Sequence, residues 1–383
     1  MRIAIVGAGL GGVTAATGLH LTGHDVTLYE RAPDLRETGT GIVVMPNGLA
    51  ALDSLGLGAP LREHAAPTTQ GGLRDRAGRP LLVTDAAKAQ ERYGQTIVVD
   101  RAVLHRTLRE RLPADCIRTG VAVGGLAEEP GRVLVDGVDD ADADAVVVAD
   151  GIGSRLRARL FPAHPGTERT GRLDLRGTLG TIPGVEDLLT AILIDRHSGA
   201  MFGLFPMGPG GLYWFTDTPM PATVPEPEQA REQVAELMAD WHPAVPAVLR
   251  ATAVADVHVD PITRLAKPLA TYATGRICLL GDAAHGMTPD LGQGASQAFE
   301  DAAALVEHLE GATPAEAAER LGRYDAERRP RANRLMAASS RQSRLTTRTG
   351  PAAWLRDTLL RATPPALAAR QLAAIWLTRG QHR

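Results

Sequence analysis

Two loops, far apart in the sequence, carry residues suited to holding one long polar ligand. The first is the turn Gly7-Ala8-Gly9-Leu10-Gly11-Gly12. The second follows the apolar run Ile277–Leu280 and contains Asp282, then Gly292-Gln293-Gly294. Glycines let a backbone approach a phosphate or a flat ring closely, and a carboxylate accepts hydrogen bonds from hydroxyl groups. Together the two loops predict one long cofactor held at two places.

The N-terminal turn has the G-x-G-x-x-G pattern of a dinucleotide site. Gly7 permits a tight turn, Gly9 leaves room for a pyrophosphate, and Gly12 lets a helix pack closely on a strand. Glu30 follows at a distance suited to binding a ribose 2′-hydroxyl, and an acid there repels a 2′-phosphate. The pattern therefore favours an FAD- or NAD-like adenosine over NADP. The alternative is a glycine-rich turn without a ligand.

The elements that position these residues read as a parallel α/β unit. Residues 2–6 form an apolar run typical of a strand buried on both faces, residues 13–21 predict a helix, and residues 24–29 predict a second strand. Residues 145–149 are another apolar run, ending in Asp150. An acid at that end of a strand lies where open α/β sheets bind ligands, although this segment taken alone favours a simple turn stabilised by Asp150.

Two further positions are weaker candidates for cofactor contact. Gly41 lies in a second glycine-containing loop soon after Glu30, and such a loop can run beside a flat ring. Arg101 precedes an amphipathic helix and either binds a cofactor or caps a neighbouring carbonyl. The sequence does not choose between these two roles.

The pattern of apolar residues changes between residues 170 and 264. Alternating residues predict strands over 173–179, 191–195, 200–205 and 212–216, followed by one helix from Glu226 to Trp241. This pattern indicates an antiparallel sheet inserted into the nucleotide domain. Its aromatic residues pack a core or line an apolar pocket for a flat substrate; they are Phe202, Phe205, Tyr213, Trp214 and Phe215.

Bulk composition excludes several classes. At 383 residues the chain is long for one core, so two domains are expected. A net charge of -3 gives no electrostatic reason to expect nucleic acid or an anionic membrane. Cys116 and Cys278 form neither a disulfide framework nor a metal motif, which favours a reducing cytoplasm. We expect no signal peptide and no membrane span.

Three segments in this order resemble the FAD-dependent aromatic hydroxylases, the single-component group similar to para-hydroxybenzoate hydroxylase. They are GAGLGG at Gly7–Gly12, ADGIGSRLR at Ala149–Arg157, and GRICLLGDAAHGMTPDLGQGASQAFEDA at Gly275–Ala302. The resemblance implies a Rossmann-like α/β FAD-binding domain with an inserted, mostly antiparallel substrate sheet and C-terminal helices. The expected boundaries are 1–72, 98–172 and 264–345 for the FAD domain, 73–97 and 173–263 for the sheet domain, and 346–383 for the helices.

The resemblance also implies a reaction and a set of contacts. FAD, reduced by NADH or NADPH, reacts with O2 to form a C4a-hydroperoxide, which hydroxylates an aromatic or polyketide-type molecule. Asp282 is expected on the ribityl chain, and the helix beginning near Ser296 is expected to point its positive end at the flavin ring. The expected FAD contacts are Gly7, Gly9, Leu10, Gly11, Gly12, Glu30, Arg31, Gly41, Arg101, Asp150, Asp282, Pro289, Gly292, Gly294 and Ala295.

No acid–base pair is evident, and no metal is expected. His285 is a weak candidate for proton transfer but is better suited to a structural hydrogen bond. Pro289 stiffens the loop and leaves a carbonyl facing the ring, and Arg176 is a weak candidate for orienting an anionic substrate. A monomer or homodimer is expected, without nucleic acid or integral membrane association.

Three alternatives remain at this point. The same flavin chemistry is also used by epoxidases and Baeyer–Villiger oxygenases. A halogenase is not supported, because this sequence lacks the catalytic lysine motif of that class. The third alternative is a protein that has kept the FAD-binding fold but catalyses no redox reaction. The apolar stripe beyond Ala352 either packs across the domain junction or lies on a membrane as a basic amphipathic helix. Its members are Trp354, Leu355, Leu359, Leu360, Leu367, Leu372 and Ile375.

Overall fold

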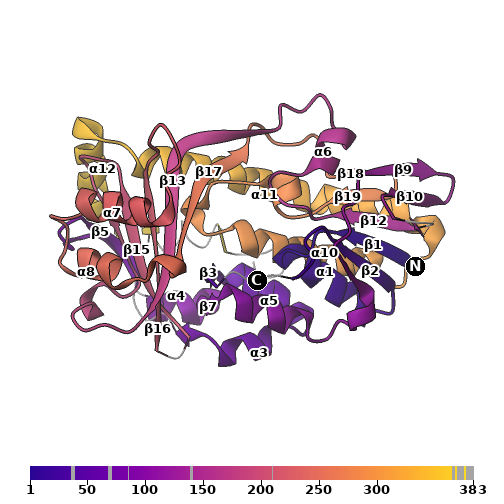
Figure 1. Ribbon diagram of the computed structural model, residues 1–383, viewed down its shortest axis with the longest axis horizontal. Coiled ribbons are helices and arrows are strands. Elements are labelled where there is room, and N and C mark those ends of the chain that lie inside the picture. Colours follow the sequence, from indigo (N-terminus) through magenta and orange to yellow (C-terminus); the bar gives the residue numbers. More distant parts are fainter. Residues whose placement is uncertain are drawn as a thin grey trace.

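A computed structural model describes residues 1–35, 39–67, 71–84, 86–138, 141–208, 210–364, 367–368 and 375–376. A six-stranded sheet lies at the right of Figure 1 and a seven-stranded sheet at the left, and the long helix α11 extends past both. In the described part of the chain, no helix combines the length and the apolar character needed to cross a bilayer.

The α-helices cover the sheets and join them. Their bounds are α1 Leu10–Leu21, α2 Pro46–Ser54, α3 Gly58–Glu63, α4 Ala86–Tyr93, α5 Arg101–Arg109, α6 Arg155–Leu160, α7 Pro227–Leu237, α8 Ala244–Ala251, α9 Asp282–His285, α10 Gly294–Leu309, α11 Ala317–Thr346 and α12 Gly350–Ala362.

The six-stranded sheet has the order β18-β19-β12-β1-β2-β8, and only the β18–β19 pair is antiparallel. Its strands are β1 Arg2–Val6, β2 Asp25–Glu30, β8 Ile117–Thr119, β12 Ala145–Val148, β18 Ala273–Thr274 and β19 Ile277–Leu279. The central strands β12 and β19 are buried at every residue, as expected for a parallel sheet covered on both faces. Three turns leave the carboxyl ends of β1, β12 and β19, so all three sequence segments meet at one edge.

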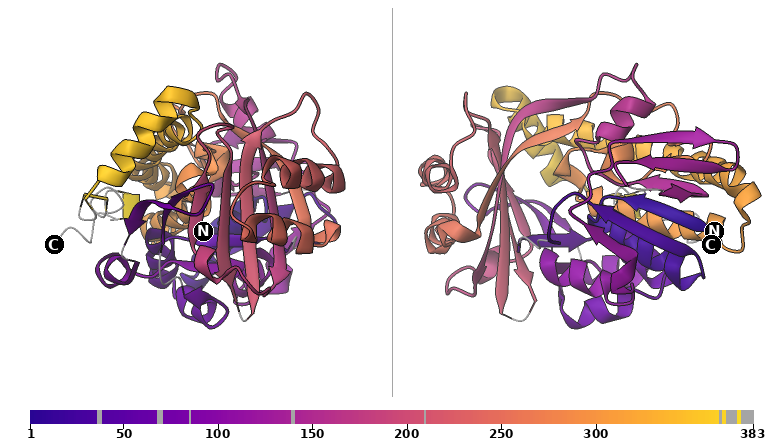
Figure 2. Two further views of the ribbon diagram at one scale, coloured as in Figure 1. Left: turned by 90° about the vertical axis from the view of Figure 1, so that its left-hand side faces the viewer. Right: turned by 45° about the vertical axis from the view of Figure 1, so that its right-hand side comes forward.

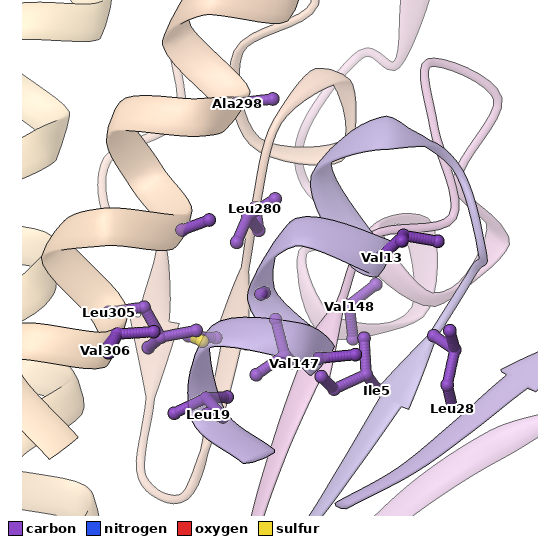
Figure 3. Packing of buried hydrophobic residues seen from close by; sticks show 14 of the residues in the cluster. Ile5, Val13, Leu19, Leu28, Val147, Val148, Leu280, Ala298, Leu305 and Val306 are labelled. Atoms are coloured by element: carbon purple, nitrogen blue, oxygen red, sulfur yellow. The ribbon is translucent and has the colours of Figure 1, made fainter. Parts of the chain in front are cut away.

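Helices α1 and α10 pack together over this sheet. Figure 3 shows Leu19 of α1 near Leu305 and Val306 of α10, and Val13, further along α1, near Val148 of β12. A second, three-stranded sheet adds valines from β10 to the same core; its strands are β9 Gly125–Glu129, β10 Arg132–Asp136 and β11 Asp142–Ala143. The apolar side chains shared by these helices and strands therefore hold the N-terminal turn in place next to α10.

The seven-stranded sheet has the order β17-β13-β16-β15-β14-β5-β6 and is antiparallel except between β14 and β5. Its strands are β5 Gly71–Asp75, β6 Pro80–Thr84, β13 Thr167–Gly180, β14 Ala191–Ile194, β15 Met201–Met207, β16 Gly211–Pro219 and β17 Val257–Leu265. Leu173, Leu175 and Trp214 belong to the core that this sheet shares with α7 and α8, which cover its outer face in Figure 2. Because side chains alternate along a strand, Asp174 and Arg176 lie on the inner face.

A third small sheet joins the two halves. It has the order β3-β7-β4, with β3 Gly41–Val44, β7 Ile97–Asp100 and β4 Ala66–Pro67. Strands β3 and β7 contact β16 and β15 of the large sheet. This sheet therefore brings the loop after Glu30 and the start of α5 against the inner face.

The predicted fold class is confirmed, including the inserted antiparallel sheet, while the exact domain boundaries stay a prediction. One predicted helix is wrong in extent. The helix expected from Glu226 to Trp241 ends at Leu237, and α8 follows after Pro243. Trp241 is instead buried in the core under the sheet, because the chain turns there to lay a second helix on the same face. Leu372 of the C-terminal stripe lies outside the described residues.

Candidate functional site

The turn after β1 is built by close contacts that only glycine allows. Gly7 has a φ of +104°, and a Cβ there would lie 2.4 Å from the Ala149 carbonyl oxygen. A Cβ on Gly12 would lie 1.9 Å from the Gly7 oxygen. Gly9 differs, because a Cβ there would meet open space, and no side chain of the described residues caps α1 above it. The turn thus leaves a space in front of free helix N–H groups, which suits a phosphate.

Two acids flank this turn. Glu30 accepts hydrogen bonds from the backbone N–H groups of Ala8 and Ala32, both at 2.9 Å. Asp150, at the end of β12, has a buried Oδ1 without a hydrogen-bond partner among the described residues. Such orphaned acceptors are rare, so Asp150 is placed to receive a donor from a ligand.

The second loop follows β19 and lies beside the first. A Cβ on Gly11 would lie 2.7 Å from a methyl carbon of Leu280, so the two turns are in contact. Gly281 has a φ of +62°, and Asp282 after it is exposed. Further along, Gly292 has a φ of +60°, and Gly294 starts α10 with open space at its Cβ position. The free N-terminus of α10 therefore faces the same region as Asp282.

A buried network of charges lies directly behind this loop. Asp301 of α10 is fully buried and accepts hydrogen bonds from Gly281 N–H at 2.9 Å, His285 Nε2 at 2.6 Å and Arg328 Nε at 2.7 Å. Burial alone would raise the pKa of Asp301, but the interactions with His285 and Arg328 outweigh burial and lower it. The carboxylate thus stays charged and fixes the turn that presents Asp282.

The same network reaches the glycine loop before α10. Glu300 accepts from both Arg328 and Arg331 at 2.6 Å, and from Asn47 Nδ2 at 2.6 Å. Asn47 also donates to Gln293 Oε1 at 2.9 Å. Gln293 stands between Gly292 and Gly294, so Arg328 of α11 is linked by hydrogen bonds to both parts of the second loop.

The two halves of the molecule meet in front of these loops. A Cβ on Gly41 would lie 2.2 Å from the Tyr213 ring, so that ring packs on the Gly41 backbone. Arg101 is exposed, yet protein surrounds it closely enough to lower its pKa, first through burial and then through Arg176. Asp282 acts on Arg101 in the opposite sense. Arg101 therefore lies between the second loop, which carries Asp282, and the inner face of the large sheet.

That inner face carries an acid row, which we define as Asp260, Asp174 and Asp217. Asp174 is directly opposite Asp260 on β17 and Asp217 on β16. Like charges in such pairs are unfavourable. Burial raises the pKa of Asp174 to about 7 and that of Asp217 to about 6, and Asp217 Oδ2 has no partner among the described residues.

Two arginines accompany the acid row. Arg176 Nε lies 2.9 Å from Asp174, and its Nη2 donates to Asp260. Arg172 Nε donates to Asp217 at 2.6 Å. Both arginines thus lie within ion-pair distance of carboxylates, whereas Arg176 Nε has no hydrogen-bond partner among the described residues, and a role for Arg176 with an anionic substrate stays a prediction.

Strand alternation divides the aromatic cluster. Phe202 and Trp214 stack in the outer core at a centroid distance of 6.3 Å. Phe205, Tyr213 and Phe215 lie on the inner face, with centroid distances of 6.1 and 6.2 Å between neighbours. The core role expected for the aromatic residues is therefore confirmed for Phe202 and Trp214, whereas a pocket-lining role stays a prediction for the three on the inner face.

A cavity of about 370 Å³ opens beside this meeting point. Asp100 and Val103 line it from around Arg101, and Thr178, Met207 and Gly211 line it from the large sheet. The cavity is on the sheet side of the site rather than among the glycine turns.

The remaining predicted residues have clear surroundings. His285 is fully buried on Asp301, with its Nδ1 unpartnered among the described residues, so it contacts no solvent and is placed for a structural bond. Pro289 and Arg31 are exposed, and Leu10 is buried behind the turn. Ala295 is half-buried in the first turn of α10. No group of metal-ligating side chains occurs in the part of the chain that the structure describes.

Sequence reasoning missed the residues that hold the loops in place. Asp301, Glu300, Arg328 and Asn47 are polar residues in helices, and no motif or spacing marks them as partners. Tyr213 was noted only as one of several aromatic residues. One signal in the sequence could have indicated them. Charged residues that interrupt an otherwise apolar helix face are buried, and buried charges need partners.

The residues present fit an FAD. The open position at Gly9, the orphaned Asp150 oxygen and the uncapped starts of α1 and α10 together offer acceptors for hydroxyls and donors for phosphates. These features lie along the carboxyl edge of the six-stranded sheet, from Glu30 to Gly294. Their order matches an extended dinucleotide with its adenosine end at β2.

Comparisons with known proteins agree with this reading. A family model described as an FAD binding domain matches residues 1–339. Aurachin C monooxygenase/isomerase of Stigmatella aurantiaca is 30% identical over 366 residues, covering 94% of each chain. FAD-dependent urate hydroxylase of Klebsiella pneumoniae is 31% identical over 320 residues, covering 80% of each. The crystal structure of Klebsiella pneumoniae HpxO with FAD and uric acid is similar at a TM-score of 0.88, with 26% identity, covering 98% of this chain and 96% of that one.

Proposed function

Because the chain belongs to the family of FAD-dependent aromatic hydroxylases, we propose that it is an NAD(P)H-dependent monooxygenase of a small aromatic or polyketide-type molecule. One oxygen atom of O2 enters the substrate and the other leaves as water, with two electrons from NAD(P)H. Bound FAD supplies the electron transfer and the activation of O2. The observation that carries the proposal is the meeting of the two glycine loops with the charged, aromatic inner face at Arg101 and Tyr213.

The chain's residues divide the work of holding FAD. Glu30 accepts from the adenosine ribose, the open backbone at Gly9 and the start of α1 take the pyrophosphate, and Asp282 accepts from the ribityl chain. The backbone from Gly292 to Gly294 would hold the ring end of the cofactor, because these glycines allow a close approach. The positive end of α10 would favour negative charge on a group bound there.

The inner face selects the substrate. Phe205, Phe215 and Tyr213 offer flat apolar surfaces for an aromatic ring. Arg176 Nε and Asp217 Oδ2 are both buried without a hydrogen-bond partner among the described residues. A substrate that offers both N–H or O–H donors and a hydrogen-bond acceptor suits this surface best. Packing of both halves around it keeps water from the reacting ring.

The cofactor part of the proposal is tested by the Asp282→Ala variant. The purified protein should be yellow, with one FAD per chain by absorbance. Asp282→Ala should weaken FAD binding by about ten-fold or more, since a hydrogen bond to a charged group contributes about 1.5–3 kcal/mol. The exposed Asp187→Ala is the matched control and should keep its FAD. An Asp282→Ala protein that stays fully yellow through gel filtration contradicts the placement.

The reaction is tested by substrate-dependent oxidation of NADH and NADPH over a panel of phenols, quinolones and polyketides. Accelerated oxidation with a product that has gained one oxygen atom supports a monooxygenase. The product's structure separates hydroxylation from epoxidation or ring expansion. Oxidation that yields only hydrogen peroxide with every compound argues against the proposed substrate classes.

A further inference from the structure

Helix α12 is firmly attached along one side. Ala353, Arg356 and Asp357 are buried, and the helix contacts β6 and the end of α11. Arg356 Nη1 donates to the Thr346 carbonyl oxygen at 2.6 Å, and its Nη2 donates to Asp357 at 2.7 Å. The helix is therefore part of the folded body, and its orientation is fixed.

The opposite side of α12 presents an apolar face, which we define as Trp354, Leu355 and Leu359. Their exposed fractions are 58%, 53% and 60%. At about 100° per residue, the three positions span an arc of about 140°. Figure 2 shows α12 in yellow at the outer edge of the molecule in its left view. A fixed group of large exposed apolar side chains marks an interaction surface.

The segment of the chain that carries this apolar face is basic, although the whole chain has a net charge of -3. Between residues 341 and 362 the only acid is Asp357, which is buried against Arg356. The exposed cations of this segment are Arg341, Arg344, Arg348 and Arg361. Of these, Arg361 lies 3.6 Å from Asp75, and the other three make no ion pair among the described residues.

The arginines beside the apolar face indicate what kind of partner binds there. A second copy of the chain in a symmetric pair would bring the same arginines face to face, which like-charge repulsion opposes. An anionic lipid surface complements both features, because tryptophan and leucine enter the headgroup boundary while arginines bind phosphates. We propose that α12 docks the protein peripherally on anionic membranes. This inference is independent of the flavin site.

Co-sedimentation of the FAD-loaded full chain with lipid vesicles tests the proposal. One set of vesicles is pure phosphatidylcholine and the other contains a quarter phosphatidylglycerol. Partitioning onto the anionic set should be about ten-fold stronger or more at 0.1 M salt, and should fall steeply at 0.5 M, where charges are screened within a few ångströms. Emission from Trp354, isolated by comparison with Trp354→Phe, should shift to the blue on binding.

Two variants and two controls separate the apolar and basic contributions. Leu359→Ser should weaken binding to anionic vesicles about five-fold or more, and Arg344→Gln about three-fold. Leu237→Ser on α7 and Arg250→Gln on α8 remove similar exposed side chains elsewhere, and should bind as the wild type does. All four should retain FAD and the wild-type melting temperature.

Three results would overturn the proposal. The first is equal binding to neutral and anionic vesicles, or no binding to either. The second is a dimer in light scattering that Leu359→Ser dissociates, which would identify a second copy as the occupant. The third is a full chain that does not bind while a chain ending at Thr363 does, which would identify the C-terminal segment itself.

Discussion

Buried carboxylates occur in two regions of this protein, and the two regions treat them in opposite ways. Behind the glycine loops, Asp301 and Glu300 are surrounded by donors, and the net effect lowers the pKa of each despite burial. On the inner face of the large sheet, burial raises the pKa of Asp174 and Asp217, and Asp217 keeps an oxygen unpartnered among the described residues.

This difference in how the carboxylates are paired indicates a different function for each region. A network in which each buried carboxylate is paired with several donors specifies one arrangement, which suits loops that must be in place before a cofactor binds. A surface with unsatisfied acceptors is incomplete by itself. Such a surface gains most from a ligand that brings donors, which is the behaviour expected where an exchangeable substrate binds. The predictions below probe these two behaviours in turn.

The largest effect is expected from Arg328→Met. This change leaves Asp301 and Glu300 with much less positive charge around them in the interior. Breaking a buried ion pair by removing one partner costs about 3–5 kcal/mol. We expect a loss of that size in the free energy of unfolding of the apoprotein, together with weaker FAD binding, because the turn at Asp282 loses its anchor. Denaturant unfolding and FAD titration measure the two effects.

Arg329→Met, one residue further along α11, is the control for Arg328→Met. Arg329 pairs with Asp325 and is partly exposed, so its loss should cost less than about 1 kcal/mol. Equal losses for the two variants would mean that the network behind the loops has no special role.

Gly9→Ala should act on binding and spare the fold. The backbone of Gly9 has a φ of -68°, which alanine adopts, and the added Cβ meets open space. A methyl group where the pyrophosphate approaches should weaken FAD binding by about 10- to 100-fold, equivalent to about 1.4–2.8 kcal/mol. The apoprotein's melting temperature should not fall. FAD titration by fluorescence and thermal melting provide the measurements.

Gly322→Ala is the control, because Gly322 lies in α11 with open space at its Cβ position. FAD affinity should be unchanged there, and the helix should gain about 0.5–1 kcal/mol of stability. Unchanged affinity in Gly9→Ala would place the pyrophosphate elsewhere.

The parts of the site that follow from the sequence are those set by local backbone geometry. Gly7 and Gly12 fall in register with a strand and a helix because the tight turn leaves no room for a Cβ at either position, whereas Gly9 follows from the space that a pyrophosphate needs. Asp282 could be placed for the same reason, since it follows a short buried strand. The strand and helix order of the FAD-binding half follows from apolar runs that only a buried parallel sheet accommodates.

The remaining features depend on contacts between distant segments, which no local pattern reports. Arg328 meets Asp301 only because α11 crosses behind α10, and the acid row exists only because three strands align in one register. The end of α7 at Leu237 was missed because a buried Trp241 fits a helix and a turn equally well.

On the substrate side, Arg176→Met should alter substrate affinity without altering FAD content. The change leaves Asp174 and Asp260 without the cation between them, so the inner face becomes more negative. Once a substrate is known, its KM should rise about ten-fold, because its bound orientation is disturbed, while kcat changes by less than about three-fold. Arg169→Met on the same strand is exposed and should leave both constants unchanged. A lower FAD content in Arg176→Met would show that the two regions are not separable in this way.

The smallest expected effect is a change in how stability depends on pH, and it contrasts the two regions directly. The pKa of Asp174 is about 7 in the folded chain, against 3.8 for an ordinary aspartate. The folded state therefore holds a proton that the unfolded state releases, so the stability due to this group is present below pH 4 and is lost as the pH rises to about 7. Asp301 has the opposite sign, because its lowered pKa makes its contribution disappear only in acid.

Asp174→Asn removes the titration on the inner face while keeping the shape of the side chain. The free energy of unfolding of the variant should decline less steeply between pH 4 and 7 than that of the wild type, by up to about 1.4 kcal/mol per pH unit, the slope of one proton. Denaturant unfolding at a series of pH values measures this slope, with the exposed Asp187→Asn as the control. Parallel slopes for Asp174→Asn and the wild type would mean that Asp174 is charged throughout this range, and that the acid row is satisfied by its arginines in the same way as the network around Arg328.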